Sequence, residues 1–182
     1  MTDYREPRDK PLQVWMMIAS EKYAFRWDHI LRTGGSVEWP GRRVLSNFKR
    51  AGEGDRILCY QTGIREKGLV GIAEVVHPFI EGVQDMEVKG LHRFPRTIPY
   101  KGFRHLPEYR ETQAARLRHR GTMFSLTAPF VRRVWEWLEE MGDHRGARLL
   151  GWPVENDRGR SRSDPGRIRS MEGKSECKGI RG

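Results

Sequence analysis

The chain has 182 residues, 37% of them hydrophobic and 32% charged, with a formal net charge of +10 and a pI near 10.1. This length suits one domain of roughly 100 to 200 residues with a tail. No apolar run approaches the ~20 residues of a membrane span, and two cysteines are too few for a disulfide framework or a cysteine-rich zinc site.

The positive charge favours partners that carry phosphate, because lysine and arginine contacts release the counterions condensed on nucleic acids. A merely basic soluble protein is the alternative that charge alone leaves open. The charged start of the chain lacks a signal-type apolar segment. We therefore expect a cytoplasmic protein without membrane contacts.

The first half of the chain predicts two strands, two helices and a loop. Residues 13–19 form an apolar run typical of a buried strand, and residues 22–33 carry apolar side chains near helical spacing before a Gly-Gly stop. Residues 36–43 are predicted as a loop and residues 44–50 as a short helix. A second strand is expected over residues 56–62.

The second half begins with a hairpin, since a glycine-bounded loop leads from residue 62 to a strand over residues 69–79. Residues 83–100 contain Pro95 and Pro99 and predict an edge strand or a bulged strand. Three further elements are expected in chain order: a basic helix over 112–121, a last strand over 122–127 and a helix over 128–142 with Pro129 near its first turn.

The composition divides the chain into three parts: a polar lead-in (1–11), a domain (12–152) and a tail (153–182). From Glu155 onward there are eight basic and five acidic residues and almost nothing to bury, so the tail is expected to be disordered. Short strands and helices without a regular strand-helix alternation indicate an α+β domain with a small curved sheet or barrel.

Catalysis finds little support in the residue pattern. A hydrolase or nuclease needs clustered carboxylates, a metal-ligand set or an activated nucleophile. The six histidines are scattered, and there is no phosphate-binding glycine loop or dinucleotide motif. We therefore predict no enzyme, no catalytic residue, no metal and no cofactor.

Binding of a nucleobase is better supported. Polar side chains end two apolar strands, and basic side chains surround the tryptophan of the 36–43 loop. Aromatic rings stack on bases, hydroxyl and amide groups read base edges, and cations hold phosphates. The residues concerned are Ser20, Tyr60, Gln61 and Thr62 at the strand ends, and Trp39 with Arg42, Arg43 and Lys49 in the loop region. Trp39 could instead cover a barrel end, Ser20 could cap the following helix, and Tyr60 could be an ordinary strand residue.

Several short motifs resemble the EVE domain, a family of the PUA-like superfamily related to the YTH domain. They are "VWMMIASE", "VEWPGRRVLSNFKRAGEGDRILCYQTG", "GLVGIAEVV" and "MFSLTAPFVRRVWEWL". The resemblance covers about residues 12 to 141 and implies a PUA-like fold, a small curved β-barrel with helices packed around it. It also implies binding of modified bases in DNA or of RNA, linked in bacteria to modification-dependent restriction.

The chain departs from the family pattern at its polar positions. Where the family has Lys-Ser-Glu-Pro, the lysine is Ala19 and the proline is Lys22, and its His-Ser is Gln61-Thr62. The segment between Trp39 and Asn47 is also two residues shorter. These changes leave the identity of the preferred base open.

The main hypothesis is a non-catalytic reader of a flipped modified base: methylated or hydroxymethylated cytosine, or methyladenine. DNA is preferred over RNA as the partner, with a separate restriction or modification-linked effector as a further one. The predicted base pocket is Ser20, Trp39, Asn47, Tyr60, Gln61 and Thr62, and the predicted phosphate contacts are Arg42, Arg43 and Lys49. An RNA-binding accessory protein without base-modification preference and a small nucleic-acid-modifying enzyme are the rivals.

Overall fold

The computed structural model describes residues 13–23, 25–40 and 46–151. The predicted lead-in, the predicted tail and the predicted phosphate contacts Arg42 and Arg43 lie outside the described residues. In chain order the elements are β1 (Val14–Ser20), η1 (Glu21–Tyr23), α1 (Asp28–Leu31), β2 (Ser36–Trp39), α2 (Ser46–Arg50), β3 (Arg56–Thr62), β4 (Gly68–His77), β5 (Met86–Pro99), α3 (Tyr100–Phe103), α4 (Pro107–Arg110), α5 (Gln113–Arg116), β6 (Met123–Ser125), α6 (Ala128–Glu140) and α7 (His144–Leu150).

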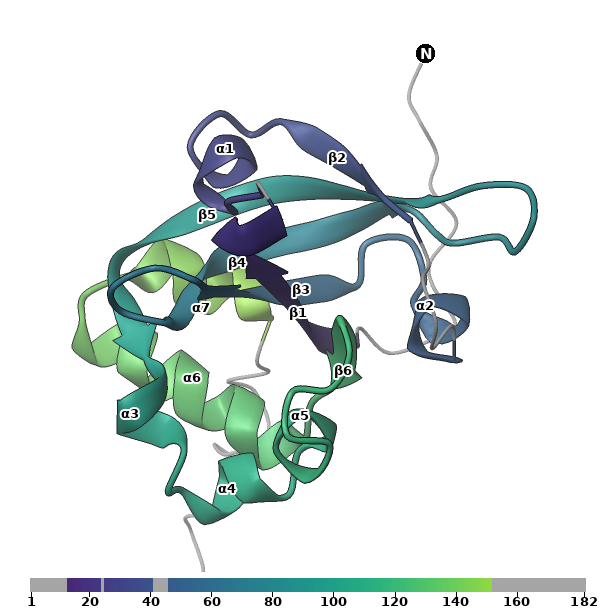
Figure 1. The fold of residues 1–182 in the computed structure, drawn as a ribbon. Coiled ribbons are helices and arrows are strands. Elements are labelled where there is room, and N and C mark those ends of the chain that lie inside the picture. The colour runs from purple at the N-terminus through teal and green to yellow at the C-terminus, as the bar shows by residue number, and fades with distance from the viewer. Residues whose placement is uncertain (1–12, 24, 41–45, 152–182) are drawn as a thin grey trace, which may run out of the picture. The chain divides into compact units, whose positions relative to one another are not determined.

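The six strands form one curled sheet in the order β2-β5-β4-β3-β1-β6 (Figure 1). β1 runs parallel to β3, and every other neighbouring pair is antiparallel. The helices α3, α4, α6 and α7 lie on one side of this sheet, while α1 lies on the other side next to β2 (Figure 1). The α+β prediction with a small curved sheet is thus confirmed.

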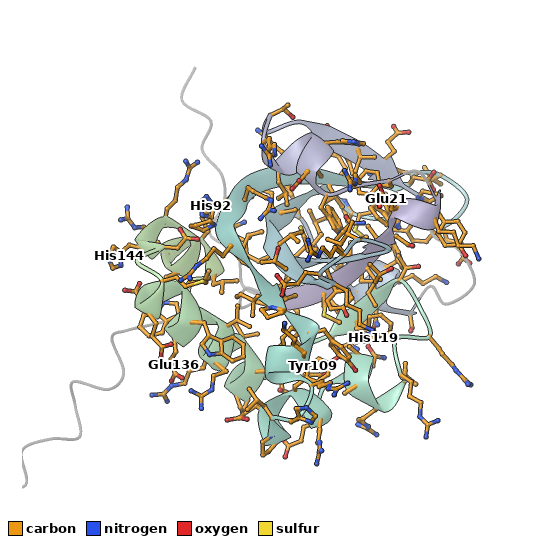
Figure 2. The ribbon with its side chains drawn as sticks, turned by 60° about the vertical axis from the view of Figure 1, so that its left-hand side comes forward. Glu21, His92, Tyr109, His119, Glu136 and His144 are labelled. Atoms are coloured by element: carbon orange, nitrogen blue, oxygen red, sulfur yellow. The ribbon has the colours of Figure 1, made fainter. Side chains whose placement is uncertain are left out.

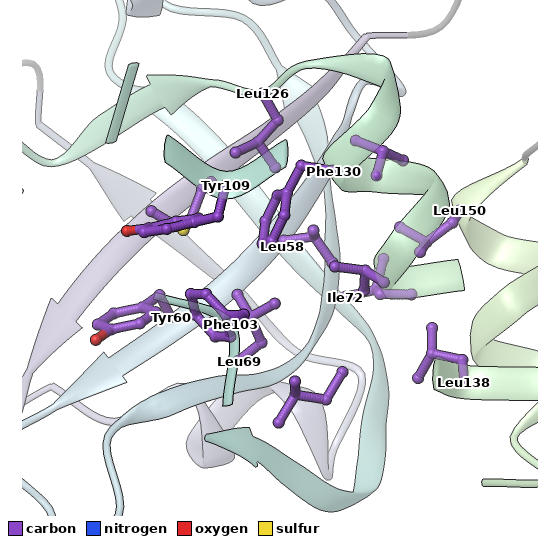
Figure 3. Close-up of a cluster of buried hydrophobic side chains, with 14 of the residues drawn as sticks. Leu58, Tyr60, Leu69, Ile72, Phe103, Tyr109, Leu126, Phe130, Leu138 and Leu150 are labelled. Carbon is purple, nitrogen blue, oxygen red and sulfur yellow. The ribbon is translucent and has the colours of Figure 1, made fainter. Parts of the chain in front are cut away.

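The sheet separates two hydrophobic cores. Side chains on neighbouring positions of a strand point to opposite faces, so Leu58 and Tyr60 of β3 join one core while Ile57 and Cys59 join the other. The first, the helix-side core, is filled by α6 and by the aromatic side chains of α3 and α4 (Figure 3). The second, the barrel-side core, is enclosed by the curl of the sheet and by α1, α2 and β2.

The helix α6 covers the helix-side core in the way its sequence predicts. Pro129 stands in its first turn, and Phe130, Val134 and Leu138 are buried on one face. The following helix α7 was not predicted; the side chain of Asp143 caps it by accepting a hydrogen bond from the Gly146 backbone N–H at 3.1 Å. Asp143 also contacts His92 Nε2 of β5 at 2.8 Å, which fastens α7 to the sheet.

The strand β5 is the bulged strand that was one of the two predictions, because its ladder to β4 has three register shifts, and it is an edge strand over only part of its length. Its residues 86–89 pair with β2 and are therefore interior to the sheet. Beyond Gly90, no strand of the described chain pairs with this side of β5, and the ladder to β4 is interrupted between Arg93 and Ile98. Pro95 lies in this interruption, where its missing N–H costs no ladder hydrogen bond.

The helix predicted over residues 22–33 is wrong in extent. The structure has the short turn η1 and the four-residue α1, separated by a stretch that contains Phe25 and Arg26. A side chain of β3, Gln61, accepts the backbone N–H of Trp27, so this N–H makes a tertiary contact in place of a helical one. The predicted loop 36–43 also begins with a strand, β2, whose Val37 and Trp39 turn toward the barrel-side core.

The turn into β2 is held close to the sheet because Gly90 has no side chain. A Cβ atom at Gly90 would lie 2.2 Å from the Ile30 carbonyl oxygen, far inside contact distance. The end of α1 therefore rests directly on the β5 backbone. This close approach fixes α1, and with it the segment Phe25–Trp27, over the barrel-side core.

Candidate functional site

The candidate site lies where the parallel strands β1 and β3 end. Ser20 and Thr62 are register partners at the carboxyl ends of these strands, so their side chains lie at the same edge of the sheet. Both are half-buried. The Ser20 Oγ accepts a hydrogen bond from the Lys22 backbone N–H at 3.3 Å, which is the capping role that the sequence left open. The Phe25–Trp27 segment passes beside this edge.

Gln61 holds that segment in place. Its amide is buried with 4% of the residue exposed, and its Oε1 accepts the Trp27 backbone N–H at 2.9 Å. Its Nε2 donates to the carbonyl oxygens of Thr62, Phe25 and Ala19 at 3.1, 3.3 and 3.4 Å. The Trp27 indole Nε1 donates to the Tyr60 carbonyl at 3.1 Å. Gln61 is therefore a positioning residue, with its hydrogen-bonding groups engaged inside the protein.

Phe25, Trp27 and Trp39 form what we call the aromatic stack. The rings of Trp27 and Trp39 are stacked, with centroids 5.1 Å apart and an interplanar angle of 16°. Phe25 stands across both, at 83° to Trp39 and 84° to Trp27. Trp27 is fully buried, whereas Trp39 and Phe25 are half-buried. No second ring of the described chain stacks on the face of Trp39 that Trp27 leaves uncovered.

Phe25 and Trp27 are site residues that the sequence interpretation missed, because it assigned them to the packing face of a helix. Their spacing was the available signal. Two aromatic residues at positions i and i+2 cannot share one face of a helix. In the structure the two residues lie in the irregular turn that leads into α1, outside a continuous helix, and both rings contact Trp39.

A cleft of about 260 Å³ opens on the outer side of this segment, against Gln61. It is lined by Arg26, Asp28, Gln61, Ile64, Arg65, Glu66, Val70, Arg93 and Thr97. The Arg93 guanidinium is engaged with Asp28 and with the Val70 and Phe94 carbonyls, so its charge is neutralised locally. Trp39 is not among the lining residues, and Gln61 links the cleft to the aromatic stack through its hydrogen bond with Trp27.

Two predicted pocket residues point elsewhere. Tyr60 is fully buried in the helix-side core, against Tyr100 and His119, and so faces away from Trp39. Burial raises the pKa of its phenol above the ordinary value, and its Oη has no hydrogen-bond partner in the described chain. Asn47 is also buried, and its Nδ2 donates to Gln113 Oε1 and to the Met123 carbonyl, both at 2.7 Å.

Of the predicted residues, the structure thus brings Ser20, Gln61 and Thr62 together, and Gln61 reaches Trp39 through Trp27. It places Tyr60 and Asn47 in internal contacts. Of the predicted phosphate contacts, Lys49 is described, and its ammonium pairs with Glu81 at the surface.

Metal binding and nucleophilic chemistry each need a particular arrangement of side chains. No group of three or more His, Cys, Asp or Glu side chains among them is arranged to hold a metal ion. Cys59 is buried, and burial raises the pKa of its thiol well above the ordinary value. None of the helices described is long and apolar enough to cross a membrane.

The curled mixed sheet with helices packed on it matches the PUA-like fold. The sequence model of the EVE domain matches residues 13–137, so the chain belongs to the EVE domain family. No curated protein matches the sequence.

Solved structures share the fold at low sequence identity. A hypothetical protein from Leishmania major has a TM-score of 0.62 and 17% identity, covering 74% of this chain and 99% of its own. The DUF55 domain of human thymocyte nuclear protein 1 has a TM-score of 0.58 and 14% identity, covering 69% and 98%. Human THYN1 protein in complex with 5-methylcytosine-containing DNA has a TM-score of 0.50 and 16% identity, covering 64% and 91%.

Proposed function

We propose that this chain is a non-catalytic DNA-binding protein that takes a flipped modified base against Trp39. The observation that carries the proposal is the aromatic stack of an EVE domain. In it, the half-buried ring of Trp39 stacks on the buried ring of Trp27, near the polar ends of β1 and β3. A structural relative was solved with 5-methylcytosine-containing DNA. That makes 5-methylcytosine the first base to test, with hydroxymethylated cytosine and methyladenine as the others.

The contacts divide into stacking, edge recognition and support. The base stacks on the face of Trp39 that Trp27 leaves uncovered, a contact worth about 1 to 3 kcal/mol. The hydroxyls of Ser20 and Thr62 supply hydrogen bonds to the base edge, while Gln61 holds the aromatic stack. Tyr60 contributes its backbone carbonyl, which accepts the Trp27 indole N–H, whereas the Asn47 side chain is engaged with Gln113 and Met123. From the sequence, we expect Arg42, Arg43 and Lys49 to contact the phosphates next to the base.

This arrangement suits a reader because the stack is assembled before the base arrives. Extruding a base from a duplex costs a few kcal/mol. A mobile tryptophan would add an ordering cost of about 0.5 to 1.5 kcal/mol to each binding event. Here the stacking on Trp27 and the hydrogen bonds of Gln61 have already ordered the ring.

The test is fluorescence-anisotropy binding at one fixed salt concentration. The probes are duplexes of one sequence that are unmodified or carry 5-methylcytosine, 5-hydroxymethylcytosine or N6-methyladenine, with the matching RNA strands. A tenfold preference for one modified duplex corresponds to about 1.4 kcal/mol. Trp39→Ala is expected to weaken binding of that duplex about 5- to 150-fold, and Trp39→Phe to retain most of it.

Trp135→Ala is the matched control, because Trp135 is a half-buried tryptophan of α6 that packs on the helix-side core. Its loss is expected to lower the melting temperature without changing the ratio of affinities for modified and unmodified duplexes. Equal binding of the wild type to all duplexes would refute the proposal. Tighter binding to RNA, without regard to modification, would favour the RNA-binding alternative.

A further inference from the structure

A basic groove lies on the other side of the β3–β4 hairpin from the aromatic stack. It has a volume of about 660 Å³ and is formed by the hairpin loop and the start of α3. Its lining holds four cationic side chains and one carboxylate: Arg65, Lys67, Lys101, Arg104 and Glu66. The groove therefore has an excess of three positive charges. All five side chains belong to exposed residues.

The single carboxylate does not neutralise this charge. Glu66 lies 3.6 Å from Lys101 Nζ, with the two side chains 52% and 79% exposed. An exposed pair of this kind contributes at most about 1 kcal/mol and is screened by salt. Arg104 Nε donates to the His105 ring nitrogen Nε2 at 3.0 Å. The excess of three positive charges in this exposed lining therefore favours an external anion.

The floor of the groove is a rigid aromatic surface. Tyr100 is half-buried there, and Lys67 Nζ lies 4.9 Å from its ring centre. Beneath it, the rings of Tyr60, Phe103, Tyr109 and His119 pack against the Tyr100 ring. Tyr109 and His119 are hydrogen-bonded to each other and lie close together (Figure 2). The hydroxyls of Tyr60 and Tyr109 point the same way, away from Leu138 and Leu150 (Figure 3).

The groove and the cleft beside Gln61 are neighbours, because Arg65 and Glu66 line both. A chain that follows the groove thus leads to the residue that positions the aromatic stack. Nucleic-acid backbones match such a path, because each phosphate carries one negative charge and contacts them are made mostly by arginine and lysine. A globular acidic partner would need a broader surface of standard size, about 800 Å² on each side.

We propose that this groove binds the phosphodiester backbone of the DNA whose base is taken up at Trp39. The inference rests on the proposed function for the identity of the partner, and it adds phosphate contacts that are separate from Arg42, Arg43 and Lys49. The backbone runs along Arg65 and Lys67 on one wall and Lys101 and Arg104 on the other. These contacts fix the position of the duplex and carry no information on base modification.

The experiment compares two triple variants with equal change of charge. The groove variant is Lys67→Gln, Lys101→Gln and Arg104→Gln. The control variant removes three exposed arginines of α6 and α7 that do not line the groove: Arg132→Gln, Arg145→Gln and Arg148→Gln. Binding of one modified and one unmodified duplex is measured between 50 and 200 mM salt.

Each phosphate contact contributes about 0.9 to the slope of log affinity against log salt concentration. The groove variant is therefore expected to flatten the slope by about 2 to 3, while the control variant flattens it by less than about 1. The ratio between modified and unmodified duplexes should not change in either variant. Equal slopes for the two variants would overturn the groove proposal.

The two proposals fail in different ways. A wild type without preference for any modified duplex refutes the base-reader function, yet a flatter slope in the groove variant would still support the groove as a backbone site. A preserved preference with unchanged slope refutes the groove alone. Lys101→Glu, at a side chain that is 79% exposed, is a second variant without risk to folding. It is expected to weaken binding of both duplexes by equal factors, and an unchanged affinity would count against the groove.

Discussion

Replacing Gln61 by methionine tests whether its buried side-chain amide holds the rings of the aromatic stack in position. Methionine keeps nearly the same length and fills the same space, so the change removes hydrogen bonds without opening a large cavity. The Trp27 N–H, bonded to Oε1 at 2.9 Å, then becomes a buried donor without a partner. Such a group costs about 1 to 3 kcal/mol. Loss of the three longer bonds from Nε2 adds about 1 kcal/mol.

The expected loss of unfolding free energy is therefore roughly 2 to 4 kcal/mol, measured by urea denaturation followed by circular dichroism. Gln84→Met is the matched control, because the Gln84 Nε2 makes one exposed bond to the Pro78 carbonyl at 2.9 Å. That change is expected to stay within about 0.5 kcal/mol. The preference for a modified duplex should fall in Gln61→Met and persist in Gln84→Met. If Gln61→Met lowered the unfolding free energy no more than Gln84→Met does, other contacts would hold the Phe25–Trp27 segment in place. The reasoning for Gln61 would then be wrong.

Two further predictions concern stability. Burial and the charge of Lys67 lower the pKa of the His119 imidazole below 6.5. The unfolded chain then binds a proton that the folded chain does not, so stability falls as the pH drops below about 6.5, by up to about 1.4 kcal/mol per pH unit. His119→Asn should flatten that dependence in urea unfolding at pH 7 and 5, and an identical dependence in both proteins would exclude His119 as its source. Gly90→Ala is expected to cost about 1 to 3 kcal/mol or more, since its Cβ would collide with the Ile30 carbonyl. Gly52→Ala, which meets nothing within 4 Å, should stay within about 0.5 kcal/mol; similar melting temperatures for the two variants would contradict this account.

The strands were predictable where apolar runs are long enough to be buried on both faces. β3 and β4 are central in the sheet, and the first six residues of β4 are all buried. Their continuous apolar runs therefore predicted the two strands without any need for alternation. β2 was missed because a strand of four residues shows only two inward positions, Val37 and Trp39, and both occur beside turn residues. The short helices α3 and α4 were missed for a similar reason, since each has four residues and a single buried side chain.

The site was predictable only in part, because a side chain's direction depends on contacts far along the chain. Tyr60 and Gln61 are neighbours at a strand end, and alternation alone says that they face opposite sides. Which of the two side chains faces Trp39 depends on the curl of the sheet and on the position of α1. The local sequence determines neither of them. The role of Gln61 likewise requires the backbone of Trp27, 34 residues away, which no short motif encodes.

The pairing of β1 also shapes how the protein is made. Val14 pairs with Arg56 and Trp15 pairs with Ser125, so the first strand needs partners 42 and 110 residues further along the chain. Ribosomes add roughly 5 to 20 residues per second. The apolar strand β1 therefore waits on the order of 5 to 20 s between its own synthesis and that of its last partner. During that interval one edge of a strand rich in large apolar side chains stays unpaired, so the nascent chain exposes an aggregation-prone surface until β6 is made.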